Sequence, residues 1–482
     1  MDADRRGRAR RSAWMAGAWL CASLAGASGT RAAEEPPEST LDLTLAGALK
    51  RAALVSQDRR IAASQVTAAE AQLVASRSAA LPQVNADFSY TRTIRTPFEV
   101  PDGGIPGMVL PWGMKNTWVG GFDIAQPLYA GGRIRAGVEA SRQSVAVSRA
   151  QAVEVDEDVK SSVVGAYLGA VLAQRLAEIT RLSAEQVDLQ LRESRLRREA
   201  GNASDLDVSR AEVERENFEP ERVAALNDAD LSLHRLMQIL NLPAGTKIRL
   251  TDGLSASSVQ PLAPAVLEGM AVGALERRAS LVAANRSIAV QQAQEKTARA
   301  ALLPTVKLSA RLGAQAFPVP VMPVGSDWLD DWNVGFSIRV PVLDWGQRSS
   351  QIAVAREQVT QSTLQRDRLV YTISLDVEQG RAEVSRALAL LSARTRTAAQ
   401  AEKNHELTKL SYSVGSASYL QLTDARSSLQ KARANEVQAV HDYYIALVRL
   451  QRAAGIPIDL SGIGASPAVE ARPTAASPTR TQ

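Results

Sequence analysis

Two sets of residues have types and spacings that could support chemistry. Residues 131–135 read Gly-Gly-Arg-Ile-Arg between a predicted strand and a predicted helix, the usual place of a phosphate-binding loop. They lack both the Gly-Lys-Ser/Thr element and the G-x-G-x-x-G spacing, so a strand-to-helix turn explains them fully. The three histidines are His234, His405 and His441. They lie far apart within helical patterns, so only the fold could gather them into a metal site. We therefore expect no cofactor, no metal site and no catalytic residue.

An arginine-rich run offers a third possibility, a surface that guides an anionic substrate. Its members are Arg192, Arg195, Arg197 and Arg198. Glu193 and Glu199 are interleaved with them, which is typical of a solvated helix face with surface ion pairs. We favour the solvated face, and nothing in the sequence indicates an enzyme.

The N-terminus has the pattern of a secretory signal peptide over residues 1–27. Five arginines precede an apolar run at 13–24, and Ala-Gly-Ala at 25–27 has the small-x-small form of a cleavage site. The run is too short to span a bilayer. The only cysteine, Cys21, lies inside it, so the mature chain would contain no disulfide and no thiol nucleophile. A lipid anchor at Cys21 is the alternative, although the preceding Ala-Trp-Leu matches a lipobox poorly.

Removing this segment removes most of the apparent basicity of the chain. The whole chain has 56 Lys and Arg against 51 Asp and Glu, whereas residues 28–482 have 51 against 49. The composition therefore gives no support for a nucleic-acid partner. After residue 27 there is no run of about 18 apolar residues, so a membrane role would depend on strands.

The chain repeats itself at an offset of 214 residues. Pro127, Gly132 and Gly201 recur as Pro341, Gly346 and Gly415. Further upstream, Leu-Pro-x-Val at 81–84 returns at 303–306. A repeat of this length is too long for a solenoid unit, so it indicates a duplicated domain.

Each copy has the same predicted order of elements, which is helix, strand, strand, helix, helix. Helices are predicted over 44–80, 133–200 and 203–242 in the first copy, and over 265–303, 347–414 and 419–455 in the second. Alternation of apolar and polar residues predicts strands at about 84–95, 117–126, 306–315 and 331–340. The proline-free helix of each copy would be roughly 100 Å long, about as long as the two shorter helices laid end to end.

These elements divide the chain into five segments. They are a signal peptide at 1–27, a first repeat at 28–243, a linker or equatorial region at 244–264, a second repeat at 265–457 and a C-terminal tail at 458–482. The tail is rich in Pro, Ser, Thr and Ala, and we expect it to be disordered.

Four amphipathic strands cannot stand alone in a bilayer, because an open sheet leaves two unpaired edges in hydrocarbon. Membrane barrels close with eight or more strands, so several subunits would have to pool theirs. Alternation predicts a polar lumen face with Lys307, Ser309, Arg311, Asn333 and Arg339. Of the Trp and Phe residues after the signal, all but Phe218 lie in the two strand-loop-strand segments, as aromatic girdles would require. The alternative is a periplasmic coiled-coil scaffold or adaptor without a barrel.

On these features the chain resembles the TolC-type outer-membrane efflux family. The resemblance rests on the duplicated element order, the two Leu-Pro-x-Val motifs, Pro-Leu-Tyr-Ala-Gly-Gly at 127–132, and Gly-x-x-Ser turns at Gly201 and Gly415. It implies a mainly helical homotrimer whose twelve-stranded outer-membrane β-barrel continues as a twelve-helix periplasmic α-barrel. The implied function is a passive exit duct in outer-membrane lipid, serving a tripartite efflux pump or a type I secretion system. An inner-membrane pump of the RND or ABC type would feed it through a periplasmic adaptor.

The resemblance also implies roles for individual positions. The barrel-to-helix junctions are Pro127, Gly131, Gly132, Pro341 and Gly346. The adaptor-docking turns hold Gly201, Ser204, Leu206, Gly415, Ser418 and Leu420. The periplasmic gate positions are Asp424, Gln421, Asp207 and Asp205. This chain departs from the family pattern at two places: Pro220 interrupts the predicted helix over 203–242, where we expect a kink, and the second junction reads Asp-Trp-Gly, with one glycine instead of two. At the gate, Gln421 also stands where an Asp is expected.

Overall fold

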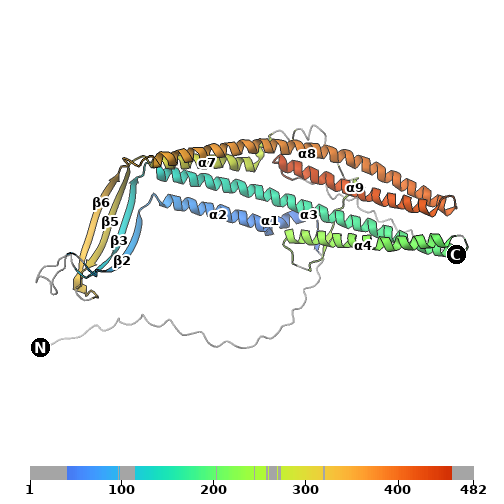
Figure 1. Cartoon of the computed structure of the whole chain (residues 1–482), viewed down its shortest axis with the longest axis horizontal. Helices are drawn as coiled ribbons and strands as arrows, with labels where there is room; N and C mark the ends of the chain where they lie inside the picture. The colour runs from blue at the N-terminus through green and yellow to red at the C-terminus, as the bar shows by residue number, and fades with distance from the viewer. Residues whose placement is uncertain are drawn as a thin grey trace, which may run out of the picture.

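The computed structural model describes residues 41–458, apart from 96, 98–113, 202, 244, 257–258, 260–268, 270–272 and 319–320. The predicted signal peptide, most of the predicted tail and part of the linker lie outside these residues. The described chain is elongated, with a sheet standing at one end of a set of long helices (Figure 1).

Two helices of equal length run the whole way from the sheet to the opposite end. They are α3 (Arg133–Glu199) and α8 (Gln347–Ser413), with 67 residues each. Shorter helices lie against them: α2 (Gln57–Ser78) and α4 (Asp205–Ile239) along α3, and α7 (Ala279–Ala300) and α9 (Tyr419–Ala453) along α8. Each long helix is therefore matched by two short helices laid nearly end to end, as the lengths predicted.

The predicted helices over 44–80 and 265–303 are each wrong in one respect, because each is broken. Ser56 ends α1 (Leu45–Val55), and its hydroxyl accepts the Arg59 backbone N–H at the start of α2 at 3.4 Å. In the second copy, α6 (Ala274–Arg277) ends at Arg278, whose extended backbone separates it from α7. Proline and glycine do not mark either break, so the sequence pattern did not reveal them.

Four strands form one antiparallel sheet in the order β2-β3-β5-β6. They are β2 (Gln83–Arg92), β3 (Asn116–Tyr129), β5 (Thr305–Ala316) and β6 (Trp328–Arg339). β3 is longer than predicted, because a register shift between Pro127 and Tyr129 lets the strand continue past the proline. Within the described residues, β2 and β6 each pair on one side only.

The hydrophobic core lies at mid-height, where the short helices meet end to end. A two-stranded parallel sheet, β1 (Leu41–Leu43) with β4 (Ile248–Leu250), packs beside it. Tyr167 of α3 is fully buried there, and its hydroxyl lies 2.9 Å from the Leu43 carbonyl and 3.0 Å from the Asp252 carboxylate. The same carboxylate oxygen accepts the Leu45 backbone N–H at 2.7 Å, which caps α1. Tyr167 thus joins α3 to β1 and to the segment that follows β4.

An acidic stretch of α3 holds the ends of the short helices at this level. Its residues and their partners are Glu154 with Arg278, Asp156 with Arg59, and Asp158 with Arg452. These partners come from α2, the α6–α7 boundary and α9. Ion pairs thus accompany the start of α2, the boundary between α6 and α7, and the end of α9. The sequence shows this cluster as Glu-Val-Asp-Glu-Asp at 154–158, a signal that the sequence analysis did not use.

Replacing Tyr167 with Phe should lower the free energy of unfolding by about 1 kcal/mol, because it deletes a buried hydrogen-bonding hydroxyl. Burial first, and then the Asp252 charge, raise the pKa of the Tyr167 phenol. The folded state therefore holds this proton more tightly, and its stability should decline as the pH rises past about 10, the ordinary phenol pKa. Urea unfolding followed by circular dichroism at neutral and alkaline pH measures both effects.

The matched control is Tyr371→Phe, since Tyr371 is exposed on α8. Tyr371→Phe should change neither the urea concentration at the midpoint of unfolding nor the pH dependence of that midpoint. An equal loss in the two variants would show that the Tyr167 contacts do not stabilise the core.

Candidate functional site

The sheet has one apolar face, because residues paired across the strands carry side chains of the same kind. Leu308 lies opposite Phe336, and Leu312 lies between Phe122 and Trp332. At the end of the sheet far from the helices, this face carries a group of aromatic side chains in mutual contact, namely Phe88, Tyr90, Trp118 and Trp328. Trp332 and Phe336 are each 72% exposed, so nothing in the described chain covers this face.

The other face is polar and contains the five residues predicted to line a lumen, Lys307, Ser309, Arg311, Asn333 and Arg339. The Arg311 guanidinium lies 3.2 Å from an Asp123 carboxylate oxygen on β3 and 3.5 Å from one of Asp331 on β6. Gln315 also donates to Asp331. A polar network thus crosses three strands on this face, as a water-facing surface would allow.

At the first strand-to-helix junction, both glycines occupy the left-handed region. Gly131 has φ +61° and Gly132, the N-cap of α3, has φ +83°. A Cβ at Gly131 would lie 2.7 Å from the Ala300 carbonyl oxygen and 2.8 Å from the Leu303 Cβ. The backbone conformation and the close approach of α7 therefore both require glycine here.

The second junction makes the same turn with a tryptophan in place of the first glycine. Trp345 has φ +52°, and Gly346, the N-cap of α8, has φ +91°. The Asp344 carboxylate compensates by accepting the backbone N–H groups of Gly346 and Arg348, at 3.3 and 3.0 Å. Trp345 is 90% exposed, so its side chain meets no steric barrier.

Two similar turns lie at the opposite end of the molecule, between α3 and α4 and between α8 and α9 (Figure 1). Gly201 and Gly415 have φ +76° and +78° and follow the long helices. Each return helix begins with a capping box, formed by Ser204 with Asp207 and by Ser418 with Gln421. The leucine two residues after each serine, Leu206 or Leu420, is exposed. The two tips thus present the same residue types in the same local structure.

The four predicted gate residues are not gathered in one place within a chain. Asp207 and Gln421 are engaged in the capping boxes, and Asp205 pairs with Arg198 at 2.6 Å. Asp424 is exposed on α9. The role of Asp424 in a gate stays a prediction.

A polar cluster joins the two helical hairpins above the tips, and the sequence analysis missed it. Glu214 of α4 accepts hydrogen bonds from Tyr419 at 2.8 Å and Thr423 at 3.4 Å and pairs with Arg426, all on α9. Arg426 is buried, and burial lowers the pKa of its guanidinium to about 10, which leaves it charged at neutral pH. Glu214 supplies the countercharge. An arginine at the apolar spacing of Tyr419, Leu422 and Leu429 is the signal that could have revealed it.

Aromatic contacts reinforce this connection. The Arg197 guanidinium of α3 lies 4.7 Å from the ring centroid of Tyr412 on α8, within reach of a cation–π interaction. Tyr412 also packs edge to face with Tyr419. Arg197 pairs with Glu193 as well, at 2.6 Å, and Arg195 with Glu212 at 2.7 Å, so these members of the arginine run are engaged in surface pairs.

The described part of the chain shows neither a cluster of metal ligands nor a helix that could span a membrane. No three His, Cys, Asp or Glu side chains there are arranged to hold a metal ion. Burial first, and then Lys409 and Arg433, lower the pKa of His405, which disfavours its charged form. No described helix is long and apolar enough to cross a bilayer.

Comparison with known proteins agrees with this geometry. The profile of the family described as Outer membrane efflux protein matches residues 48–242 and 271–456. The outer membrane efflux protein BepC of Brucella suis is 22% identical over 87% of this chain and 86% of its own length. The outer membrane protein TolC of Vibrio cholerae is 22% identical over 82% and 86%. The fold matches the CmeC outer membrane channel of Campylobacter jejuni with a TM-score of 0.71, at 17% identity, over 88% of this chain and 86% of that one.

The fold and the two-faced sheet define a passive outer-membrane channel, not an enzyme. The chain belongs to the outer membrane efflux protein family. The fold class, the outer-membrane location and the export function predicted from the sequence are confirmed. The alternative of a periplasmic scaffold without a barrel is not supported.

Replacing Gly131 with Ala should destabilise the junction by about 2 kcal/mol, because the residue would be strained and would clash with α7. Replacing Trp345 with Gly, which relieves a positive φ at an exposed position, should cause no loss. Thermal unfolding of the purified proteins measures both. Equal destabilisation by the two substitutions would contradict the conformational explanation.

Proposed function

We propose that three copies of this chain close one barrel and one helical tunnel, which together form the exit duct of a tripartite efflux pump or type I secretion system. The observation that carries the proposal is a sheet with two unpaired edges and one exposed apolar face, continued directly by helices of roughly 100 Å. Three sheets joined edge to edge would pair every strand, as hydrocarbon requires. The polar face would then line the lumen.

Assembly tests this arrangement. Phe336→Arg or Leu308→Arg should prevent trimers from accumulating in the outer membrane, since an arginine facing lipid near the bilayer centre costs about 2–4 kcal/mol. Ser337→Arg, one residue along β6 on the polar face, is the matched control and should assemble normally. Heat-modifiable bands from isolated outer membranes provide the measurement. Equal tolerance of arginine on both faces would exclude the barrel.

The paired tips support docking of a periplasmic adaptor, which an inner-membrane pump would drive. Each chain presents two similar turns with an exposed leucine, Leu206 or Leu420, so a trimer would offer six related sites. Such a set suits a six-fold partner built from helical hairpins. The left-handed glycines, Gly201 and Gly415, would set the shape of each site.

Replacing both tip glycines with Val should abolish export while trimers remain in the outer membrane, because a β-branched residue cannot readily adopt φ near +77°. Asn tolerates this conformation, so Gly→Asn at the same positions should preserve export. Survival of a strain that depends on the pump for resistance to a toxic compound reports the outcome. Normal export by the Val variant would remove the tips from the docking surface.

The gate would combine Asp424 with the Glu214 cluster. Three symmetry-related Asp424 carboxylates on the axis would attract cations, and the link between Glu214 and Arg426 would hold the two hairpins together at rest. Asp424→Ala should therefore weaken cation selectivity in single-channel recordings. The physical reason is the loss of three negative charges at the narrowest point.

Glu214→Gln separates the two roles. It leaves the Arg426 guanidinium without its countercharge and should raise the conductance of the resting channel while leaving the selectivity due to Asp424 in place. Unchanged cation selectivity in Asp424→Ala would place this residue outside the gate. Unchanged resting conductance in Glu214→Gln would show that the Glu214 cluster does not hold the channel closed.

A further inference from the structure

Charge is segregated along the polar face of the sheet. Lys307 and Arg339 lie at the end next to the helices, opposite Ser337 and Thr305. The three acidic residues of the face, Asp87, Asp123 and Asp331, all lie further from the helices. Two of them already neutralise Arg311. The helix-proximal end of this face is therefore net positive.

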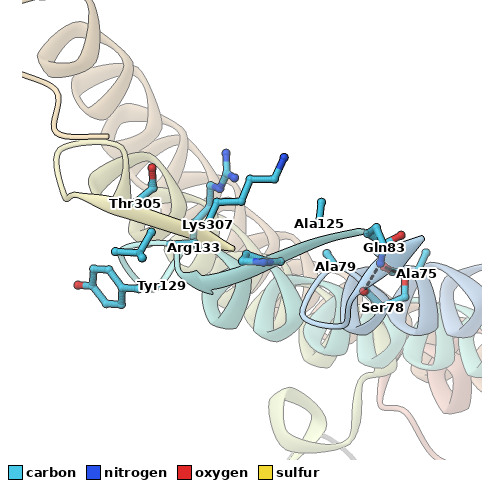
Figure 2. Close-up of a pocket in the computed structure, with 12 residues that line it drawn as sticks. Ala75, Ser78, Ala79, Gln83, Ala125, Tyr129, Arg133, Thr305 and Lys307 are labelled. Atoms are coloured by element: carbon cyan, nitrogen blue, oxygen red, sulfur yellow. Dashed lines mark hydrogen bonds between the residues drawn. The ribbon is translucent and has the colours of Figure 1, made fainter. Parts of the chain in front are cut away.

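A cavity of about 500 Å³ opens at this positive end, between the sheet and the ends of α2 and α3. Its strand residues include Gln83, Pro127, Thr305 and Lys307, and Arg133 at the start of α3 completes it. Figure 2 shows the charged side chains of Arg133 and Lys307 extending in the same direction from different elements. A site of this size can hold a small organic or inorganic anion.

No carboxylate in the described part of the chain neutralises the cavity. Neither Arg133 nor Lys307 forms an ion pair among the described residues, and both side chains are exposed to solvent. Gln83 covers the carbonyl end of α2 by donating to Ser78 and Leu81, at 2.8 and 3.2 Å (Figure 2). Two carbonyl oxygens that would repel an anion thus already accept hydrogen bonds. In addition, α3 begins at Gly132 without a side-chain cap and has no acidic residue in its first turn.

We propose that this junction cavity binds anionic groups, carboxylate or phosphate, of the molecules that pass through the channel. The inference rests on the proposed trimer, in which three cavities and the neighbouring Arg339 side chains would form a positive collar where the barrel meets the tunnel. The substrate class is therefore anionic or carries an anionic group. The polar face carries both Lys307 and the cavity, so the ligand comes from the lumen and not from lipid headgroups.

Single-channel recording with inorganic pyrophosphate as the probe tests the collar. Trimers of the full chain are inserted into bilayers of zwitterionic lipid, and pyrophosphate is added while the current is recorded. The wild-type channel should be partially blocked. The double substitution Arg133→Gln with Lys307→Gln should raise the half-blocking concentration about tenfold, since it removes six positive charges per trimer. It should also shift the reversal potential in a KCl gradient toward cations.

Two variants serve as controls. Arg135→Gln removes an exposed charge of the same helix that does not line the cavity, and it should leave the block unchanged. Lys307→Arg keeps the charge and should retain the block.

If wild-type channels conduct but are not blocked by pyrophosphate, or if Arg135→Gln weakens the block equally, the inference is overturned while the export channel stands. If an anionic lipid added to the bilayer blocks the channel and pyrophosphate does not, the cavity binds lipid headgroups and the inference is also overturned. Absence of any conductance in the wild type would instead contradict the proposed function.

Discussion

Backbone hydrogen bonding at the edges of the sheet is the constraint on which the rest of the structure depends. β2 and β6 each leave one edge unpaired in the described chain, and the apolar face between them is exposed. Neither can persist in a bilayer, where an unpaired backbone group costs several kcal/mol. The chain is therefore incomplete alone, and association of copies is required before any channel exists.

The helices extend the same geometry away from the membrane. A continuous helix follows β3 and another follows β6, so the strand positions determine where the tunnel wall begins. The short helices complete the wall and meet at mid-height, where Tyr167, Asp252 and the acidic stretch at 154–158 hold their ends. The larger hydrophobic cluster lies there, whereas the tips are joined by a small one and by the polar cluster around Glu214. More buried apolar contacts therefore hold the wall together at mid-height than at the tips.

Much of the fold could be predicted from the sequence, because periodicity and duplication are local signals. The 214-residue repeat, the strand alternation and the glycine turns at 131–132, 201 and 415 all correspond to observed features. The helix break at Ser56 was not predictable from breakers, since it depends on a serine cap and tertiary packing. The Glu214 pair with Arg426 joins residues 212 positions apart and the junction cavity draws on five elements, so neither has a signature along the chain. The roles of Asp424 and the tip residues stay predictions, since they depend on contacts between copies and with partners.

Disulfide cross-linking between copies tests whether β2 of one chain pairs with β6 of another, and it is practicable because the sequence has no cysteine beyond Cys21. Cysteine pairs, one on the polar face of β2 near Asn85 and one on the polar face of β6 near Asn333, would be scanned over neighbouring registers. Within one chain, β3 and β5 separate these edges. If three sheets close one barrel, some pairs should give covalent trimers on denaturing gels after oxidation, while single-cysteine variants should not. Only monomers at every register, from protein correctly inserted in the outer membrane, would contradict it.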